Sequence, residues 1–358
     1  MARDGLFYGR GLLRSTTCQL EVLLTNAATD RADRTYSTDP CAVIAVLTWR
    51  GYETTRSCLA SLSRLAAWPV PTLVIDNDSG TGEAERLARE FGPPVSALTL
   101  ASNGGVPAGY NAGMTWAASQ AATHVLLLNN DTLVEDPDLL DRLLAAAAPD
   151  IAAVGPMTRE ADGSIFSLGG SLNWTIAEGI QLRRPPEGSS GPYEVEWLDG
   201  SCLLVSLGSA RRIGGFAPEY FMYWEELDWC IRARRAGYRC VVEPRASIKH
   251  LRATFSPTWM VRRLMLRNAI LFMRRNGSAR QNATTLAYLL VCRAPALLIR
   301  KAWPPTDLAI ALRTIAHAVS WNILDAARRG RWRYPATGPS IEPDLSRAIG
   351  PTRTEATS

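Results

Sequence analysis

HVLLLNNDTLV, at residues 124–134, is the stretch that decides the fold. Its apolar run, Val125–Leu128, has the length and composition of a strand that is covered on both faces of a parallel sheet. Asn129, Asn130 and Asp131 follow at once and bring two amides and a carboxylate to the carboxyl end of that strand, where open α/β sheets bind ligands. Taken alone, a strand followed by an ordinary Asn/Asp turn is the commoner interpretation. The neighbouring segments must therefore show whether this strand end binds a ligand or is an ordinary turn.

The neighbouring segments alternate between strand and helix patterns. Two earlier apolar runs also end at polar residues, because CAVIAVLTW reaches Thr48 and Trp49 and PTLVIDNDSG breaks at Asp76. Helical spacing of apolar residues follows each of them. We expect strands near residues 41–49, 73–75 and 97–100, and helices near 53–67 and 83–91. This order predicts an α/β protein with a mostly parallel sheet that is flanked by helices.

A glycine-rich segment, SNGGVPAGYNAG at residues 102–113, precedes an alanine-rich helix. Its glycines permit a ligand to approach the backbone closely, and the amino terminus of the helix that follows can face a phosphate. The spacing is neither GxGxxG nor that of a P-loop, so the dehydrogenase and NTPase classes lose their best support. A plain glycine-rich turn remains open.

Length and composition set the limits. The chain has 358 residues, of which 47% are hydrophobic, so it can bury one large core with an appendage or a second domain. Its seven cysteines lack CxxC spacing, which predicts reduced cysteines rather than a zinc ribbon or a disulfide framework. The early apolar patch Cys18–Leu24 is short and contains Glu21, so we expect no signal peptide and a cytoplasmic protein.

The end of the chain is basic, although the net charge of the whole is only +5. From Leu251 onward there are 17 Lys and Arg against 5 Asp and Glu. Its apolar stretches at 259–275 and 285–299 are too short or too interrupted to span a bilayer. Between residues 307 and 324, five apolar residues share one helical face, which suits an amphipathic helix in the membrane interface; they are Leu308, Leu312, Ile315, Val319 and Ile323. A helical hairpin that packs on the rest of the protein is the alternative.

The motifs together resemble a known family. In order they are VLTW, VIDNDS, SNGGVPAGYNAG, LLLNNDTLV, WLDGSCLLVS and FMYWEELDWCIRARRAGYRCVVEP, followed by His250. This series resembles glycosyltransferase family 2, and within it the bacterial rhamnosyltransferases of cell-surface polysaccharide assembly, over about residues 41–275. The resemblance implies the Rossmann-like GT-A fold, a nucleotide-diphospho-sugar donor, a divalent metal and inversion at the anomeric carbon.

This resemblance divides the chain into four expected parts. Residues 1–40 form an N-terminal extension and residues 41–275 a GT-A catalytic domain. Residues 276–330 form a basic, amphipathic helical appendage that associates with a membrane. Residues 331–358, which are rich in Pro, Ser, Thr and Gly, form a disordered tail.

The expected metal is Mg²⁺ or Mn²⁺. A departing diphosphate accumulates negative charge, so its site needs a hard cation that is held by a few oxygen ligands. The resemblance places Asp131 as the principal ligand and His250 as the residue that closes the site, although a satisfied structural histidine remains open. Asn129 stands where relatives carry the first acid of a DxD motif, and it offers only a neutral amide.

The nucleotide should lie across the first strand ends. By resemblance, Asp76 accepts the N3–H of a uracil or thymine ring, while a turn-capping role for Asp76 remains open. Thr48 and Trp49 would flank the base. The other nucleotide-binding residues expected from the resemblance are Asn103, Gly104, Asn111 and Asn130.

The acceptor side combines Trp197, Asp199, Gly200 and Glu225. Trp197 could stack on a sugar, although a core tryptophan is the commoner fate of that residue. The resemblance places the catalytic base on Glu226, which stands where the family has the second acid of a Glu-Asp pair.

Asp228 is expected to be structural. It stands four residues before Arg232 and should pair with it. Successive helical residues turn by about 100°, so Glu226 and Asp228 cannot face one reacting centre together.

We therefore expect an inverting, metal-dependent transferase of cell-envelope glycan synthesis, peripheral on the inner face of the plasma membrane. Its donor would be a dTDP- or UDP-sugar, most simply dTDP-rhamnose, and its acceptor a glycan or a polyprenyl-diphosphate-linked glycan on an anionic membrane surface. A UDP-hexose or UDP-galactofuranose donor and a catalytically silent nucleotide-binding scaffold remain alternatives. Nucleic-acid binding through the basic tail is disfavoured because apolar residues interleave its arginines.

Overall fold

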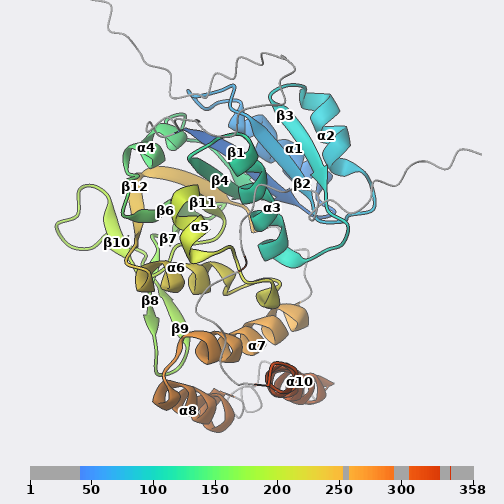
Figure 1. Cartoon of the computed structure of the whole chain (residues 1–358), viewed down its shortest axis with the longest axis vertical. Helices are drawn as coiled ribbons and strands as arrows, with labels where there is room; N and C mark the ends of the chain where they lie inside the picture. The colour runs from blue at the N-terminus through green and yellow to red at the C-terminus, as the bar shows by residue number, and fades with distance from the viewer. Residues whose placement is uncertain (1–40, 253–257, 294–305, 331–338, 340–358) are drawn as a thin grey trace, which may run out of the picture.

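The computed structural model describes residues 41–252, 258–293, 306–330 and 339. The expected N-terminal extension and, apart from residue 339, the expected disordered tail lie outside these residues. Figure 1 shows a sheet that is covered by helices on both faces, with a group of helices from the end of the chain on one side of it. The expected α/β architecture is confirmed.

One mixed sheet of ten strands organises the molecule. Its parallel half has the order β4, β1, β2, β3, and β11 runs antiparallel between β4 and β6. Beyond β6, the long strand β12 runs parallel to it and β10 forms the edge, while β5 and β7 pair with β12 and β6 and a separate hairpin joins β8 to β9. The strands are β1 (Ala42–Thr48), β2 (Thr72–Asp76), β3 (Val95–Thr99), β4 (His124–Asn129), β5 (Thr132–Leu133), β6 (Ile151–Arg159), β7 (Ile165–Ser167), β8 (Gly170–Asn173), β9 (Glu178–Gln181), β10 (Tyr193–Val195), β11 (Cys202–Ser206) and β12 (Arg239–His250).

Two hydrophobic cores lie on the two faces of this sheet. Side chains of β4 alternate between them, since Val125 and Leu127 belong to one core and Leu126 and Leu128 to the other. This alternation explains why the β4 run is apolar throughout. The helices are α1 (Tyr52–Leu62), α2 (Glu83–Phe91), α3 (Gly105–Ser119), α4 (Leu139–Ala145), α5 (Leu207–Ile213), the 3₁₀ turn η1 (Pro218–Tyr220), α6 (Glu225–Arg235), α7 (Thr258–Asn276), α8 (Ala279–Tyr288), the π-turn η2 (Leu289–Arg293) and α10 (Thr306–Arg328).

Strand register brings the polar strand ends together. Thr48 of β1 lies opposite Asp76 of β2, and Leu47 lies opposite Asn129 of β4. Because the three strands are parallel, their carboxyl ends share one edge of the sheet. The polar residues that end VLTW, VIDNDS and LLLNND are therefore neighbours in space.

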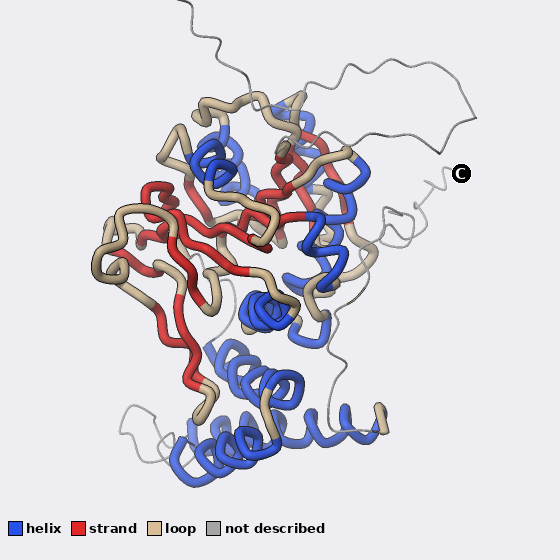
Figure 2. Tube along the Cα trace, turned by 60° about the vertical axis from the view of Figure 1, so that its left-hand side comes forward, coloured by secondary structure: helices blue, strands red, loops and turns tan. Residues whose placement is uncertain are grey.

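The last helices form a group beside the sheet (Figures 1 and 2). Helix α10 packs on α7 through Thr314, Ala318 and Asn322, and the guanidinium of Arg274, which is fully buried in α7, pairs with Asp325 at 3.0 Å. Figure 2 shows the hairpin of β8 and β9 reaching towards the same group of helices. The two are joined by a hydrogen bond that the Thr285 hydroxyl in α8 donates to the Thr175 carbonyl, in the turn of the hairpin.

The apolar face that the sequence predicts for α10 is only partly used for this packing. Leu312 and Ile323 remain 52% and 54% exposed. None of the helices within residues 41–252, 258–293 and 306–330 is long and apolar enough to cross a bilayer.

Among the described residues, the cysteines follow the sequence expectation except at Cys41. Five of them are free, namely Cys58, Cys202, Cys230, Cys240 and Cys292. Cys41, directly before β1, is disulfide-bonded, so the expectation of a reduced cysteine is wrong at this position.

Candidate active site

Asp76 stands at the end of β2 with one carboxylate oxygen in use and one without a partner. It is 0% exposed, and its Oδ1 accepts a hydrogen bond from the Ser79 amide at 2.8 Å. Its Oδ2 is buried and accepts none from the protein. Burial raises the pKa of this carboxyl, while the bonds from Ser79 oppose that shift. A buried acceptor that lacks a donor is costly, so Oδ2 suits an N–H donor of a ligand, as the N3–H of a uracil or thymine ring would be.

A buried carboxylate that the sequence analysis missed, Glu83, organises this edge. Its Oε1 accepts from the Thr48 hydroxyl at 3.0 Å, from the Gly51 amide at 3.1 Å and from the Ser79 hydroxyl at 2.8 Å. Asn130, in turn, donates to Thr48. Thr48 and Asn130 thus hold the strand ends together inside this network, in which the Thr48 hydroxyl and the Asn130 side-chain nitrogen are engaged.

Trp49 is different, because its ring is 36% exposed at the same edge. The Arg50 guanidinium lies 5.0 Å from the centre of that ring, and the Arg50 amide donates to the Ser79 hydroxyl at 2.8 Å. Arg50 has a positive φ of 51°, so the chain turns sharply here. Thr48 and Trp49 are expected to flank a base, and of these two only Trp49 has an accessible side chain.

The glycine-rich segment is attached to the loop before α6. The Asn77 side chain accepts from the Gly104 amide and donates to the Gly105 carbonyl, and Asn103 accepts from the Gly105 amide at 3.0 Å. Gly105 has φ +75°, and a Cβ there would lie 1.8 Å from the Phe221 carbonyl oxygen. Only glycine fits this position, because both its φ and the approach of the Phe221 backbone exclude a side chain.

Asn111 has a packing role rather than a place at the ligand. Its side-chain amide donates to the Phe216 carbonyl at 2.9 Å, and its oxygen accepts from the Phe216 amide at 2.8 Å. Both functional groups are therefore satisfied by one backbone residue. The expectation that Asn111 binds nucleotide is not supported by this geometry.

Asp131 and His250 are in direct contact. His250 Nε2 lies 3.1 Å from Asp131 Oδ1, and the register of β5 with β12 pairs His250 with Thr132. Burial disfavours the charged ring, but the hydrogen bond and charge of Asp131 outweigh burial and raise the His250 pKa. The second ring nitrogen, Nδ1, is buried without a partner.

The chemistry of this pair fits a divalent cation with an open coordination sphere. A carboxylate oxygen and an imidazole nitrogen this close together can ligate one ion. Within the part of the chain that the structure describes, no group of three or more His, Cys, Asp or Glu side chains could hold a metal. Two protein ligands leave room for diphosphate oxygens and water. The Asn129 side-chain oxygen accepts from the Tyr110 hydroxyl at 2.7 Å, so this amide is engaged within the protein.

Glu225 and Glu226 open α6 as a pair of acids, the first buried and the second half-buried. Each has an Oε2 atom that is buried and without a hydrogen-bond partner. Burial and the neighbouring Glu226 raise the Glu225 pKa well above its usual value, and burial, with a contribution from Asp199, raises the Glu226 pKa to about 7. A carboxyl with a pKa near 7 can exchange a proton at neutral pH.

Asp199 lies near both these acids and the metal pair, and Gly200 lies beside Glu226. The charge of Asp199 raises the pKa of both Glu226 and His250, and its Oδ1 accepts from the Ser201 amide at 3.0 Å. A Cβ added to Gly200 would lie 3.4 Å from Glu226 Cβ. The motif WLDGS therefore borders the Glu226 side chain.

Trp197, in the same motif, is a core residue. It is 6% exposed, it belongs to the larger hydrophobic core, and its indole donates to the Ser171 carbonyl at 2.9 Å. The expectation that Trp197 stacks on an acceptor sugar conflicts with this burial. The structure gives it the commoner role that the sequence left open.

Asp228 is structural, as its spacing from Arg232 predicts. Its Oδ2 accepts from the Arg232 guanidinium at 2.8 Å, and its Oδ1 accepts from Asn276 at 2.7 Å and Arg275 at 3.2 Å. Burial opposes ionisation of Asp228, but the two arginines outweigh burial and lower its pKa. The Tyr220 hydroxyl is a fourth donor to Asp228, at 3.1 Å, and the residue is 0% exposed, so this carboxylate is not accessible to a substrate.

A strained loop presents the two glutamates. Phe221, Tyr223 and Trp224 have positive φ angles of 64°, 71° and 76°, which cost on the order of 1–3 kcal/mol each. Helix α7 holds this loop, because the side-chain nitrogen of Asn268 lies 3.0, 2.8 and 2.8 Å from the carbonyl oxygens of Tyr220, Met222 and Tyr223. The sequence analysis missed Asn268, since nothing near it in the chain marks its partners.

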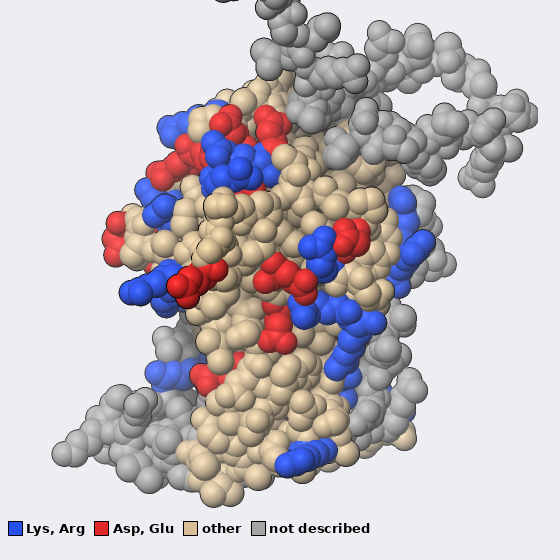
Figure 3. All heavy atoms as spheres, turned by 90° about the vertical axis from the view of Figure 1, so that its left-hand side faces the viewer, with Lys and Arg blue, Asp and Glu red and all other residues tan. Residues whose placement is uncertain are grey.

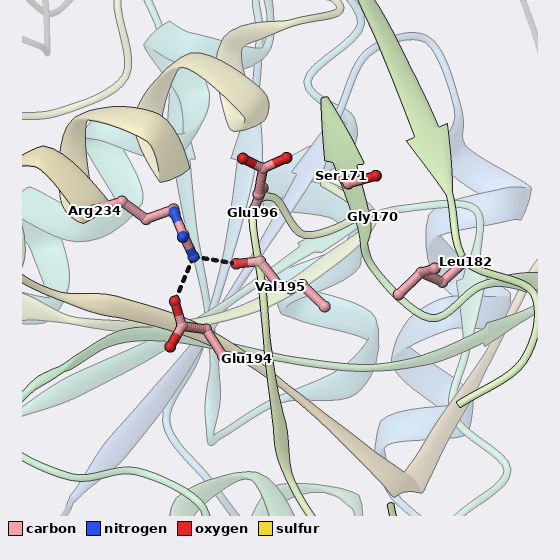
Figure 4. A pocket seen from close by; sticks show the side chains of 7 residues that line it. All are labelled: Gly170, Ser171, Leu182, Glu194, Val195, Glu196 and Arg234. Atoms are coloured by element: carbon pink, nitrogen blue, oxygen red, sulfur yellow. Dashed lines mark hydrogen bonds and ion pairs between the residues drawn. The ribbon is translucent and has the colours of Figure 1, made fainter. Parts of the chain in front are cut away.

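One pocket lies apart from these groups. It has a volume of about 240 Å³ and lies between the β8 and β10 segments and α6, where Arg234 pairs with Glu194 and also donates to the Val195 carbonyl at 3.1 Å (Figure 4). Its other charged residue, Glu196, accepts from the Leu172 amide. Its charges are thus paired within the protein, and none of the site residues predicted from the sequence lines it.

Comparison with known proteins identifies the family. Residues 43–192 match the family model described as glycosyl transferase family 2. The chain is 30% identical over 239 residues to an N-acetylglucosaminyl-diphospho-decaprenol L-rhamnosyltransferase of Mycobacterium tuberculosis, an alignment that covers 60% of this chain and 77% of that protein.

Solved structures support the fold. A structure of GalNAc-T7 with UDP, GalNAc and Mn²⁺ aligns with a TM-score of 0.56 and 10% identity over 81% of this chain and 58% of that one. A mannosyltransferase from Pyrobaculum calidifontis, solved with GDP-Man and Mn²⁺, aligns with a TM-score of 0.50 and 15% identity over 82% of this chain and 81% of that one. With its GT-A fold and its motifs at one sheet edge, the chain belongs to glycosyltransferase family 2.

Proposed function

We propose that this transferase moves L-rhamnose from dTDP-rhamnose, with inversion, onto a polyprenyl-diphosphate-linked or polysaccharide acceptor of cell-envelope glycan synthesis. The observation that carries the proposal is the acid Glu226 at the start of α6, with a buried, unpartnered oxygen and a pKa of about 7, near Asp199, whose charge also acts on His250 of the metal pair. The choice of sugar and of lipid-linked acceptor is supported by the similarity to the mycobacterial rhamnosyltransferase.

The donor would be held by its two ends. Asp76 Oδ2 accepts the N3–H of thymine or uracil, which neither cytosine nor adenine offers. Asp131 and His250 hold a divalent ion, Mg²⁺ or Mn²⁺, which supplies positive charge to the departing diphosphate when bound.

Glu226 is the general base of this proposal. Its carboxylate takes the proton from the acceptor hydroxyl as that oxygen attacks the anomeric carbon opposite the leaving diphosphate. Glu225 keeps its proton to a higher pH than usual, so it is suited to donate a hydrogen bond to the acceptor. Asp199 and Gly200 border the space in front of Glu226.

We also propose that the protein works in the cytoplasm, on the inner face of the plasma membrane. Among the described residues, several exposed large apolar side chains lie in the C-terminal helices and turns, and these are Met265, Val291, Leu312, Ile323 and Leu324. On the face shown in Figure 3, charged side chains gather over the sheet, while the helical part below is mainly uncharged with one basic patch. Such a surface suits the interface of an anionic bilayer.

A thermal-shift and turnover screen tests the donor. Mixtures of Mn²⁺ with dTDP-rhamnose, UDP-glucose, UDP-galactofuranose or GDP-mannose are compared for stabilisation and for nucleotide release with a lipid-linked acceptor. We expect dTDP-rhamnose to give both signals. Stabilisation and release by another sugar nucleotide alone would contradict the donor assignment, and stabilisation without any release would favour the silent scaffold.

A further inference from the structure

A second pocket, of about 270 Å³, lies between the C-terminal helices and the loop that presents Glu225 and Glu226. Its lining combines cationic and apolar side chains from that loop, α7 and α10, and these are Phe221, Met260, Arg263, Leu264, Arg267 and His317. No part of the proposed donor site lines it. Its ligand must therefore be sought in its own chemistry.

The Arg263 guanidinium has an unusual partner. It lies 2.9 Å from Nδ1 of His317. Because arginine has only donors, this nitrogen must accept, so the ring is neutral and carries its proton on Nε2. Within the described residues Arg263 forms no ion pair with a carboxylate, and His317 is its only hydrogen-bond partner.

The surroundings keep this corner positive. Burial lowers the His317 pKa, and the charges of Arg263 and Arg267 lower it further. Arg267 is fixed in place, because it donates to the Glu219 carbonyl at 2.9 Å and lies 4.6 Å from the centre of the Trp321 ring. An anion that enters would meet the Arg263 guanidinium and the field of Arg267 together, and an imidazole N–H can add a third donor.

The remaining walls are apolar. Leu264 is 7% exposed, and Met260 and Phe221 are half-buried beside it. A small inorganic anion would leave this surface unused, whereas an amphiphile that carries an anionic head and a hydrocarbon chain would use both kinds of wall.

The pocket is joined to the proposed acceptor site through one loop. Phe221 lines the pocket and stands four residues before Glu225, and Arg267 in the pocket wall binds carbonyl groups of the same loop. A group bound in the pocket is thus one loop away from the base. This is the relation expected of a sugar acceptor and the diphosphate that carries it.

We propose that this pocket binds the diphosphate and the first isoprenoid carbons of a lipid-linked acceptor, with Arg263 as the main phosphate ligand. The proposal rests on the proposed function for the identity of the acceptor, but its binding chemistry stands on the pocket alone. Arg263 contributes a forked donor that matches phosphate oxygens.

Direct binding tests it without the transfer reaction. Farnesyl diphosphate is titrated into the full-length protein by calorimetry in the presence of EDTA, so that a metal-held diphosphate at Asp131 makes no contribution. Farnesol and inorganic pyrophosphate are titrated in parallel. We expect farnesyl diphosphate to bind more tightly than either.

Two variants in the pocket and one control locate that binding. Arg263→Gln should lower the affinity for farnesyl diphosphate by about 10-fold or more, the order expected for a lost charge-assisted hydrogen bond. Met260→Glu, which adds a negative charge to the wall, should weaken it as well. Arg280→Gln removes the same charge from an exposed position of α8 outside the pocket and should change nothing.

Three outcomes overturn the proposal. These are unchanged binding in Arg263→Gln with an unchanged melting temperature, no binding by the wild type, and Arg263-dependent binding to phosphatidylglycerol vesicles alone, which would assign the pocket to a bilayer headgroup. Arg263-dependent binding in a protein that turns over no dTDP- or UDP-sugar would support the pocket and reject the proposed function.

Discussion

The side-chain nitrogen of Asn268 in α7 lies 2.8 Å from the Tyr223 carbonyl oxygen, two residues before the buried acid Glu225. The same nitrogen reaches the carbonyls of Tyr220 and Met222. A helix outside the sheet thus fixes the backbone that delivers the proposed base.

Loss of this amide should therefore impair both stability and turnover. Asn268→Ala removes this donor from the Met222 and Tyr223 carbonyls, while the Tyr220 carbonyl keeps its bond from Arg267. A buried acceptor that loses its donor costs on the order of 1–3 kcal/mol. Asn282 is a matched control, since it also donates to three carbonyls, those of Met273, Gly277 and Ser278, at the turn between α7 and α8. Chemical denaturation should show comparable losses in both variants, while kcat of the folded enzyme should fall in Asn268→Ala alone. Equal kcat in the two variants would separate Asn268 from the catalytic loop.

The base assignment predicts a pH profile. Because the Glu226 pKa is raised to about 7, the carboxylate form that accepts a proton is lost as pH falls through 7. Turnover should therefore decline on the acid side of neutrality in the wild type. Glu226→Gln should keep donor binding, reduce kcat by roughly 10²-fold or more and remove this acid limb.

The raised Glu226 pKa also predicts how the free energy of unfolding changes with pH. A carboxyl with a raised native pKa binds more protons in the native state, so the free energy of unfolding falls as pH rises from about 4.5 to about 7. Glu226→Gln should make this fall shallower in denaturant titrations at successive pH values. An unaltered pH dependence of both turnover and unfolding would show that the base lies elsewhere.

Asp76→Asn should weaken binding of the nucleotide. The substitution keeps an oxygen for the Ser79 amide but puts an N–H where the base presents its own, so dTDP affinity should fall by about 10-fold or more. Asp78→Asn, at an exposed position two residues on, should bind dTDP as the wild type does. Calorimetry with dTDP and Mn²⁺ measures both, and similar losses in the two variants would reject the assignment to Asp76.

Asp131→Ala should abolish turnover and the thermal stabilisation that Mn²⁺ gives with the donor, because it removes the carboxylate of the metal pair. Removal of metal by EDTA should have the same effect on the wild type. Asn129→Asp provides the opposite change, since a carboxylate there still accepts from Tyr110 and adds a charge beside the proposed metal. It should leave turnover intact or tighten Mn²⁺. Full activity of Asp131→Ala would remove Asp131 from the mechanism.

Membrane association should depend on the apolar surface of α10. The wild type should sediment with anionic liposomes and be released by salt. Ile323→Ser should reduce the bound fraction, because this side chain is 54% exposed on that surface. Ile180→Ser in the β9 hairpin, 48% exposed, is the matched control and should bind as the wild type. Equal sedimentation of both variants and the wild type would place the contact elsewhere.

Local patterns explain which parts of the site could be predicted. Asp76 ends an apolar strand and Asp131 comes two residues after another, and parallel strands bring such ends to one edge. The pairing of Asp228 with Arg232 also follows from their separation of four residues. In these cases the deciding neighbours lie close by in the chain.

Other parts depend on contacts that the sequence does not display. Glu83 meets Thr48 across 35 residues, and Asn268 meets Tyr223 across 45, so neither could be identified from its neighbours. Asn111 and Trp197 were assigned to ligands by their motifs, yet both side chains bind backbone groups of the protein. A motif indicates where a residue lies along a strand or helix, but not whether its polar groups are already hydrogen-bonded within the protein.

The contact of Gly105 with the Phe221 backbone connects the donor side and the acceptor side of the proposed site. The donor-side turn and the acceptor-side loop touch with no side chain between them, and the Val106 amide donates to the Phe221 carbonyl at 2.7 Å. Movement of either segment away from the other would break this hydrogen bond. On the proposed function, opening of the donor-side turn would therefore be coupled to opening of the acceptor-side loop.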